Sequence, residues 1–131
     1  MSQTREYVPG YFAEARLLPN GFKYPASYLA FAASGRSHVG PVNEDWLVLE
    51  ESQIEKFFGY VKAASPEKAL VPFMRVNGDD GVACSDADSL SEDPLVYVCN
   101  VFHNFGCWGS QKTFSEWLSE ILADEERDAA P

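Results

Sequence analysis

The chain has 131 residues, which is the length of a single domain. It carries 10 basic and 20 acidic residues, a net charge of −10, and 46% of its residues are hydrophobic. The hydrophobic content excludes a wholly disordered chain, and the acidic balance excludes unaided binding to nucleic acids or anionic membranes.

Three features of the sequence bear on cellular location. The apolar runs, such as 28–33 and 70–74, are far shorter than the ~20 residues of a membrane-spanning helix. The first residues, Met1 to Glu6, are polar and differ from a secretory signal sequence. Three cysteines are an odd number, which disfavours a disulfide framework. Together these features predict a cytoplasmic protein with reduced cysteines.

In the first half of the chain, the hydrophobic pattern predicts two helices and one strand. The segment 7–18 fits a helix or a short strand equally well. Segment 25–35 begins with proline, has apolar residues at i, i+3 and i+4, and ends in Ser-Gly, so it is expected to be a helix. A short apolar run at 46–49 predicts a buried strand. The apolar stripe within 51–65 predicts a second helix packed on one side.

A β-hairpin is the clearest prediction in the middle of the chain. The run 70–76 is apolar and predicts a strand. The next five residues, 77–81, read Asn-Gly-Asp-Asp-Gly, which favours a tight turn because Asn, Asp and Gly tolerate positive φ. The returning strand is expected at 82–84.

The last third of the chain predicts one more strand and a closing helix. Residues from 94 to 102 are rich in β-branched and aromatic types, and 102–109 is expected to be a loop. A helix starting near 111–113 carries an unbroken apolar stripe. The final residues, 123–131, are strongly acidic and predict a solvated tail.

These elements predict an α+β fold. We expect a single domain over residues 1–131, with its core within about 17–122 and a central mixed or antiparallel sheet flanked by helices.

The acidic residues lie mostly after residue 43, in three clusters. Turn residues hold the middle cluster between two apolar strands, which makes it a candidate surface for a basic partner. Its members are Asp79, Asp80, Asp86, Asp88, Glu92 and Asp93. Trp108 is added to this candidate surface as an aromatic anchor. An ordinary solvated hairpin rim is the alternative explanation of the same charges.

Cysteine and histidine spacing raises two possible chemistries. Cys99, His103 and Cys107 lie four residues apart, which fits part of a zinc site or a Cys–His nucleophile. A structural zinc site needs four ligands, so Cys84 would have to complete it from another strand. A catalytic thiol also needs an orienting group and an oxyanion site, which the sequence does not indicate. An enzyme that uses Cys84, His103 or Cys107 is therefore kept only as the least favoured hypothesis.

Other catalytic and cofactor motifs do not occur in the sequence. Counted from Asp86, the sixth position is Ser91 where an EF-hand needs glycine, so the aspartates do not form that calcium loop. Phosphate-binding loops and the serine nucleophile elbow are absent from the sequence. We therefore expect no catalytic residue, no metal site and no cofactor.

A series of short motifs runs through most of the chain. In order they are Leu18-Pro19, Phe22, Pro25-x-x-Tyr28-Leu29-x-Phe31, Gly35, Trp46 to Leu49 with Glu51 to Phe58, Val71-Pro72-Phe73, Asn77-Gly78-Asp79-Asp80-Gly81, Cys84-x-Asp86, Pro94-Leu95-Val96-Tyr97 and Phe114-x-x-Trp117-Leu118. Over about residues 17–122 their order and spacing resemble the SUKH superfamily, the Smi/Knr-like domains. The chain departs from that pattern at Ser34, where the family usually has asparagine, and in the segment 102–109.

The resemblance implies both a fold and a function. It implies an α+β domain without enzymatic activity. Many bacterial members are immunity proteins that bind and neutralise a cognate toxin, often a nuclease, and others are regulatory scaffolds. A basic toxin would be attracted by a chain of charge −10. The expected function is therefore that of a cytoplasmic immunity protein for a basic toxin, with a scaffold that binds an endogenous partner protein as the alternative.

Overall fold

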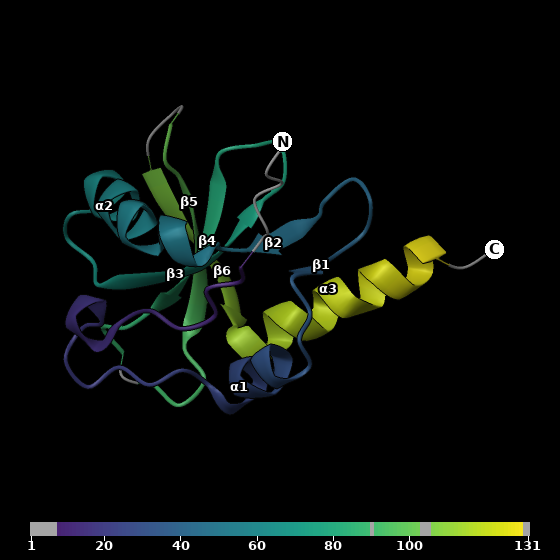
Figure 1. The fold of residues 1–131 in the computed structure, drawn as a ribbon, viewed down its shortest axis with the longest axis horizontal. Coiled ribbons are helices and arrows are strands. Elements are labelled where there is room, and N and C mark those ends of the chain that lie inside the picture. The colour runs from purple at the N-terminus through teal and green to yellow at the C-terminus, as the bar shows by residue number, and fades with distance from the viewer. Residues whose placement is uncertain (1–7, 90, 103–105, 130–131) are drawn as a thin grey trace, which may run out of the picture.

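The computed structural model describes residues 8–89, 91–102 and 106–129 (Figure 1). A six-stranded sheet forms its centre, with strand order β1-β2-β3-β4-β5-β6 and antiparallel pairing throughout. The strands are β1 (His38–Val39), β2 (Trp46–Val48), β3 (Leu70–Val76), β4 (Gly81–Asp86), β5 (Leu95–Asn100) and β6 (Gly106–Thr113). The helices are α1 (Ala26–Ala33), α2 (Ile54–Ala64) and α3 (Phe114–Ala129), with short 3-10 turns η1 (Ala15–Leu17) and η2 (Glu51–Gln53). The predicted α+β class is confirmed, and the sheet is antiparallel.

The helices cover both faces of the sheet and make a three-layer arrangement. Helices α1 and α3 lie together on one face, and α2 lies on the other (Figure 1). Within β4, Val82 and Cys84 pack with α2, whereas Ala83 packs with α1 and α3. Successive strand residues point to opposite faces, so a single strand supplies both hydrophobic cores.

Aromatic side chains fasten α1 and α3 to the sheet. The ring of Phe114 lies 5.4 Å from that of Tyr28 and 5.2 Å from that of Phe73, and both pairs meet edge to face. Tyr28 and Phe114 are almost completely buried. The Tyr28 hydroxyl donates a hydrogen bond of 2.6 Å to the carbonyl of Tyr11, which satisfies its polar end. This contact also ties the segment before α1 to the core.

The hairpin predicted in the middle of the chain is confirmed. Strand β3 covers 70–76 as expected, and β4 returns beside it as far as Asp86. Gly78 has a φ of +82°, the left-handed conformation that the Asn-Gly pair in the turn predicts. The hairpin therefore follows directly from the turn sequence.

The C-terminal segment differs from the solvated tail expected at 123–131. Helix α3 begins at Phe114 and continues to Ala129. Its last turns are held because Glu125 accepts hydrogen bonds from the Arg36 side chain, at 2.6 Å, and from the Gly40 backbone N–H, at 2.9 Å. Acidic residues here connect α3 to the end of β1.

Strand β6 replaces the second half of the loop expected at 102–109 and continues to Thr113. It runs along the edge of the sheet, paired with β5 only, and residues 103–105 lie outside the described residues. None of the helices in the described part of the chain has the length and apolar character needed to cross a membrane.

The Glu125 contact predicts a pH-dependent contribution to stability. The hydrogen bond from Arg36, with that from Gly40, lowers the pKa of Glu125. A carboxyl whose pKa is lower in the folded protein than in the unfolded chain stabilises the fold when it is ionised. This stabilisation is complete above the pKa of the unfolded chain, about 4.3, and is lost as the pH falls through the pKa of the folded protein. We expect Glu125→Gln to lower the free energy of unfolding at pH 7 by up to about 1 kcal/mol, because the pair is partly exposed.

Urea unfolding at pH 7 and near pH 3 measures this effect. The difference between the two proteins should shrink as the pH falls, because protonation of Glu125 removes the charge that Glu125→Gln also removes. Glu126→Gln, a change at the exposed neighbouring position, is the control and should have no measurable effect. A difference of the same size at both pH values would assign the effect to packing and not to charge.

Candidate functional site

The structure divides the predicted acidic surface into two groups. Asp79 and Asp80 lie in the β3–β4 turn, and Asp86 lies at the opposite end of β4. A strand rises about 3.3 Å per residue, so the six residues of β4 place the two groups roughly 20 Å apart. Residues that are close in sequence therefore do not form one surface.

At the Asp86 end of β4, the carboxylates of Asp86 and Asp88 make structural contacts with Lys68. Asp86 is 6% exposed and accepts a hydrogen bond of 3.0 Å from the Asp88 backbone N–H. Lys68 Nζ lies 3.5 Å from the Asp86 carboxylate and 3.7 Å from that of Asp88. Asp88 also accepts a hydrogen bond from the Ala69 backbone N–H at 3.1 Å. These two carboxylates join the start of β3 to the end of β4.

Asp93 also makes a structural contact. Its carboxylate accepts a hydrogen bond of 3.0 Å from the backbone N–H of Ser115, at the start of α3, where helix N–H groups lack partners within the helix. Glu92, beside it, is exposed. At this end of β4, the contacts of Asp86, Asp88 and Asp93 explain their positions without a partner protein.

Asp79, Asp80 and Trp108 do come together, in a surface hollow of about 670 Å³. We call it the acidic hollow. Its lining residues are Asn43, Glu44, Trp46, Val76, Asp79, Asp80, Gly81, Val98, Asn100 and Trp108. Trp108 is 51% exposed, which is unusual for a large aromatic side chain.

Two turns that are distant in sequence build the rim of the acidic hollow. Trp46 of β2 pairs with Val76 of β3, so the residues before β2 meet the residues after β3. The backbone N–H of Asn77 donates a hydrogen bond of 2.8 Å to the carbonyl of Asp45, which fixes the two turns to each other. Glu44 thereby joins the aspartates of the β3–β4 turn.

The lining of the acidic hollow favours a cation. It contains three carboxylates and no lysine or arginine. Glu44 and Asp79 are exposed, so their carboxylates are available to a partner. The face of an exposed tryptophan such as Trp108 attracts a lysine or arginine side chain, by about 0.5–1 kcal/mol at an exposed site. The hollow is therefore suited to basic side chains of another protein.

Trp46 also lines the acidic hollow. Its side chain is 5% exposed, and its indole N–H has no hydrogen-bond partner among the described residues. A buried donor without a partner costs about 1–3 kcal/mol.

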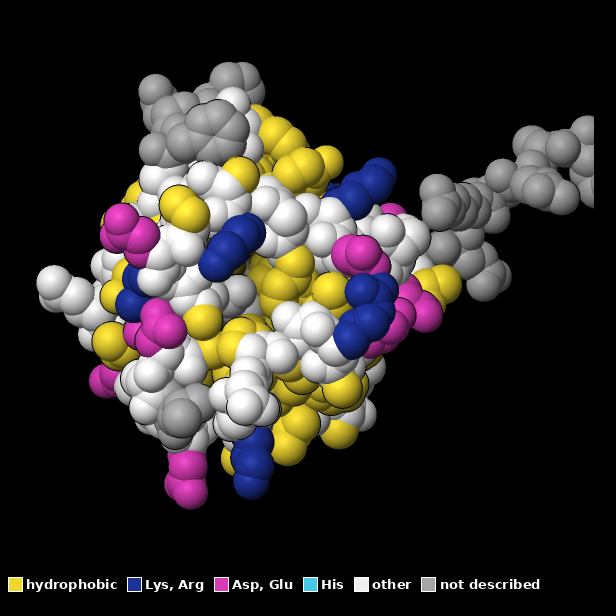
Figure 2. Space-filling view, turned by 90° about the vertical axis from the view of Figure 1, so that its left-hand side faces the viewer, with side chains coloured by type: hydrophobic (Ala, Val, Ile, Leu, Met, Phe, Trp, Pro, Cys, Tyr) yellow, Lys and Arg dark blue, Asp and Glu magenta, His cyan; other side chains and the backbone are white. Residues whose placement is uncertain are grey.

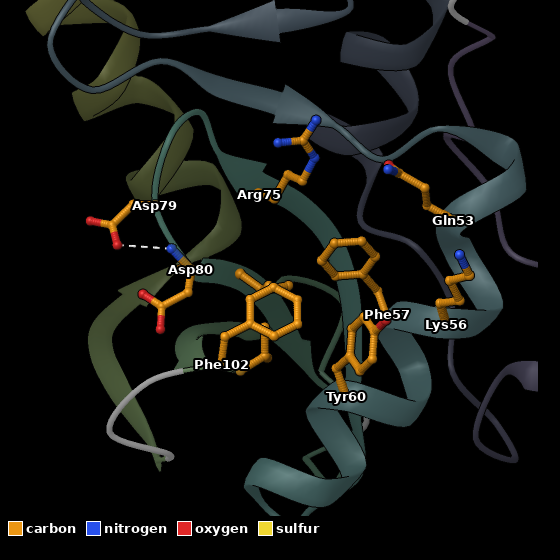
Figure 3. A pocket seen from close by; sticks show the side chains of 11 residues that line it. Gln53, Lys56, Phe57, Tyr60, Arg75, Asp79, Asp80 and Phe102 are labelled. Atoms are coloured by element: carbon orange, nitrogen blue, oxygen red, sulfur yellow. Dashed lines mark hydrogen bonds between the residues drawn. The ribbon is translucent and has the colours of Figure 1, made fainter.

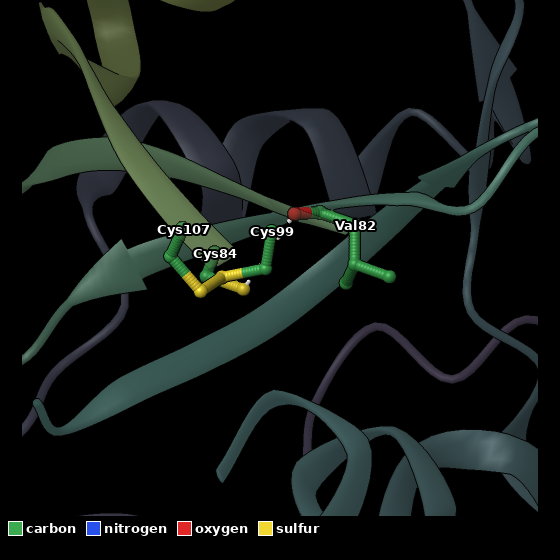
Figure 4. The surroundings of a disulfide bond; sticks show 4 residues. All are labelled: Val82, Cys84, Cys99 and Cys107. Carbon is green, nitrogen blue, oxygen red and sulfur yellow. Dashed lines mark hydrogen bonds between the residues drawn. A yellow bond between two sulfur atoms is a disulfide. The ribbon is translucent and has the colours of Figure 1, made fainter. Parts of the chain in front are cut away.

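The expectation of three reduced cysteines is wrong. Cys99 and Cys107 are paired residues of β5 and β6 and form a disulfide (Figure 4). Cys84 keeps a free thiol, and burial raises its pKa. An odd number of cysteines leaves one thiol unpaired but does not prevent the other two from bonding.

This pairing bears on both chemistries considered from the spacing. The sulfurs of Cys99 and Cys107 are bonded to each other and are not thiolates, and the buried Cys84 thiol is protonated at neutral pH. His103 lies outside the described residues. Within the described part of the chain, no three His, Cys, Asp or Glu side chains are grouped so that they could hold a metal ion.

Comparison of the chain with family models, curated proteins and solved structures gives no match to any of the three.

Proposed function

We propose that this protein is a non-enzymatic binding domain that engages a basic partner protein through the acidic hollow. The observation that carries this proposal is the convergence of Glu44, Asp79 and Trp108 on a hollow without basic lining residues. Carboxylates on two adjacent turns attract lysine and arginine side chains, and the exposed tryptophan supplies an apolar anchor at the same place.

The partner we propose is a toxin that this protein neutralises as an immunity protein. The resemblance to the SUKH superfamily supports this role, and so does the net charge of −10, which would accelerate association with a basic toxin. A regulatory scaffold for an endogenous partner is the alternative. Co-expression with a basic toxin encoded beside the gene distinguishes them, because an immunity protein restores growth and a scaffold does not.

The proposed cytoplasmic location has a consequence for the disulfide. Disulfides form and persist in oxidising compartments, whereas the cytoplasm keeps thiols reduced. In the cytoplasm Cys99 and Cys107 would therefore be thiols during toxin binding. Binding measurements under both oxidising and reducing conditions are needed to describe the protein at its site of action.

Charge neutralisation at the hollow tests the proposal. The probe is a lysine-rich decapeptide, and its binding is followed by tryptophan fluorescence. The part of the fluorescence change that is lost in Trp108→Phe comes from this site. We expect Glu44→Gln with Asp79→Asn to weaken peptide binding about tenfold at low salt, since two attractive charges are lost. The loss should shrink as the ionic strength rises, because salt screens exposed charges.

The matched control removes two exposed charges elsewhere, with Glu92→Gln and Glu126→Gln. Both double variants have the same net charge, so only position separates them. We expect less than a twofold change in affinity for the control. Equal losses in the two variants would mean that the peptide responds to total charge, and the acidic hollow would no longer be the binding site.

A further inference from the structure

A second pocket lies on the other face of the β3–β4 turn, beside α2 (Figure 3). Its volume is about 280 Å³, close to the lower end of the range for small-molecule sites. We call it the aromatic pocket. Its lining residues are Gln53, Lys56, Phe57, Tyr60, Arg75, Asp79, Asp80, Gly81, Val82, Val101 and Phe102.

Three aromatic rings form one side of the aromatic pocket. Phe57 and Tyr60 come from α2, and their ring centroids are 5.5 Å apart. Phe102 follows β5, lies 5.1 Å from Tyr60 and is 51% exposed. Figure 3 shows the three rings beside one another below Arg75. An aromatic side chain that stays half exposed at the edge of a pocket offers contact area to a flat apolar ligand.

Two basic side chains, Lys56 and Arg75, also line the pocket. Arg75 pairs with Val82 across β3 and β4, which places it on the face of the sheet that α2 covers. Lys56 reaches the pocket from α2. Neither has an ion-pair partner within 4 Å among the described residues. Among the other described basic residues, Arg16, Arg36, Lys68, Lys112 and Arg127 are in ion pairs, whereas Lys23 and Lys62 are not.

Lys56 and Arg75 differ from the other unpaired cations because they line one pocket, in a chain where acids outnumber bases two to one. On the face shown in Figure 2, acidic and basic side chains are interspersed, with hydrophobic side chains between them. Carboxylates are therefore plentiful, but the described ones do not neutralise Lys56 or Arg75. A carboxylate ligand in the pocket would gain charge-assisted hydrogen bonds from both side chains.

Two aspartates limit the charge of such a ligand. Asp79 and Asp80 line the end of the pocket away from Lys56 (Figure 3). The Asp79 carboxylate accepts a hydrogen bond of 2.8 Å from the Asp80 backbone N–H, which holds it in the turn. A second negative charge on the ligand would be repelled at this end. The pocket thus favours one carboxylate over several and disfavours phosphates and dicarboxylates.

We infer that the aromatic pocket binds a small molecule that carries one carboxylate and one aromatic group. The carboxylate contacts Arg75 and Lys56, and the aromatic group packs against Tyr60 and Phe102. This site shares Asp79, Asp80 and Gly81 with the acidic hollow, but its cations lie on the opposite face of the sheet from Trp46 and Val98. A peptide that ends in phenylalanine offers the same chemistry, but the volume favours the free small molecule.

Titration with phenylacetate, followed by backbone amide NMR shifts, tests the inference. We expect a dissociation constant of about 0.1–1 mM, which is typical of a ligand of this size. Phenylacetamide, which is neutral, and phenylmalonate, which has two carboxylates, should each bind at least tenfold more weakly. Equal binding of phenylacetate and phenylacetamide, or no shifts below 10 mM phenylacetate, would overturn the inference.

Variants then locate the site. Lys56→Gln with Arg75→Gln should weaken phenylacetate binding at least tenfold. Lys62→Gln, on the same helix but outside the pocket, is the control and should bind as the native protein does. A thermal melt verifies that the double variant folds. If the double variant does not fold, Lys56→Gln alone is used and should weaken phenylacetate binding about threefold.

A peptide comparison distinguishes the two sources of this chemistry. Gly-Gly-Phe with a free carboxyl end should bind more weakly than phenylacetate, because its extra residues exceed the pocket. Tight binding of the peptide with none of phenylacetate would overturn the inference in favour of a peptide terminus. Glu44→Gln changes the acidic hollow but no lining residue of the aromatic pocket, so it should weaken lysine-peptide binding and leave phenylacetate binding unchanged. The two proposals can therefore fail separately.

Discussion

Replacing Gly40 with alanine is expected to lower the free energy of unfolding by about 3 kcal/mol. Gly40 has a φ of +122°, which residues with a side chain rarely adopt. An added Cβ would lie 2.3 Å from the carbonyl oxygen of Glu44 and 3.5 Å from the Cγ2 of Ile121. The nearest obstacle is backbone, so it cannot move aside as a flexible side chain would.

Gly35→Ala is the matched control for this prediction. Gly35 also has a positive φ, +77°, but an added Cβ would meet no atom within 4 Å. Only backbone strain then remains, with a cost of about 1 kcal/mol. Urea unfolding of both variants measures the difference. Equal losses would show that the close approach of Gly40 to Glu44 does not limit stability.

The Gly40 variant also links the fold to the proposed site. The carbonyl that the new Cβ would displace belongs to Glu44, which lines the acidic hollow. We therefore expect Gly40→Ala to weaken lysine-peptide binding as well, while Gly35→Ala leaves it unchanged. The stability of this turn and the position of a binding carboxylate depend on the same glycine.

The predictable parts of the fold are those whose signals are local. Helix α2 follows from the apolar stripe of Ile54, Phe57 and Val61, all three of which are buried. The β3–β4 hairpin follows from its turn residues. Strand β6 could not be predicted in this way. It contains Gly106, Gly109 and several polar residues, and these do not give the alternation of polar and apolar residues that is typical of a strand. It forms because β5 offers it an edge to pair with, which is information from outside its own sequence.

The same contrast explains what could be predicted of the site. Asp79, Asp80 and Trp108, which the sequence analysis places in one candidate surface, line the same hollow. Asp86 was grouped with them because it is near in sequence, but a strand carries it to the opposite end of the sheet. The sequence carries no signal for Glu44 at this site, since only the pairing of Trp46 with Val76 brings it to the hollow. Charged residues that are close in sequence therefore do not indicate which strand ends lie together in the fold.

Removing the disulfide with Cys99→Ser and Cys107→Ser is expected to lower the free energy of unfolding by about 2.5 kcal/mol. The two cysteines are 8 residues apart, and closing a chain segment of that length restricts the unfolded state by roughly this amount. Cys99 is fully buried, so burying a hydroxyl in its place adds to the loss. Cys107→Ser alone leaves the buried position as cysteine and isolates the contribution of the bond.

Thiol counting verifies the pairing before stability is compared. The native protein should not react with a thiol reagent, because Cys84 is buried. Unfolding without a reductant should expose one thiol, and reduction should expose all three. Three reactive thiols without reduction would contradict the disulfide and remove the basis of the stability prediction.

Reduction also decides whether the acidic hollow works in the cytoplasm. Trp108 follows Cys107 directly in β6, so the bond holds the strand that carries the aromatic anchor. Glu44 and Asp79 lie in other turns and do not depend on it. The β5–β6 hydrogen bonds remain after reduction, and we expect lysine-peptide affinity to change less than twofold while the midpoint of urea unfolding falls. A large loss of affinity on reduction would place the binding function in an oxidising compartment and would exclude a cytoplasmic immunity protein.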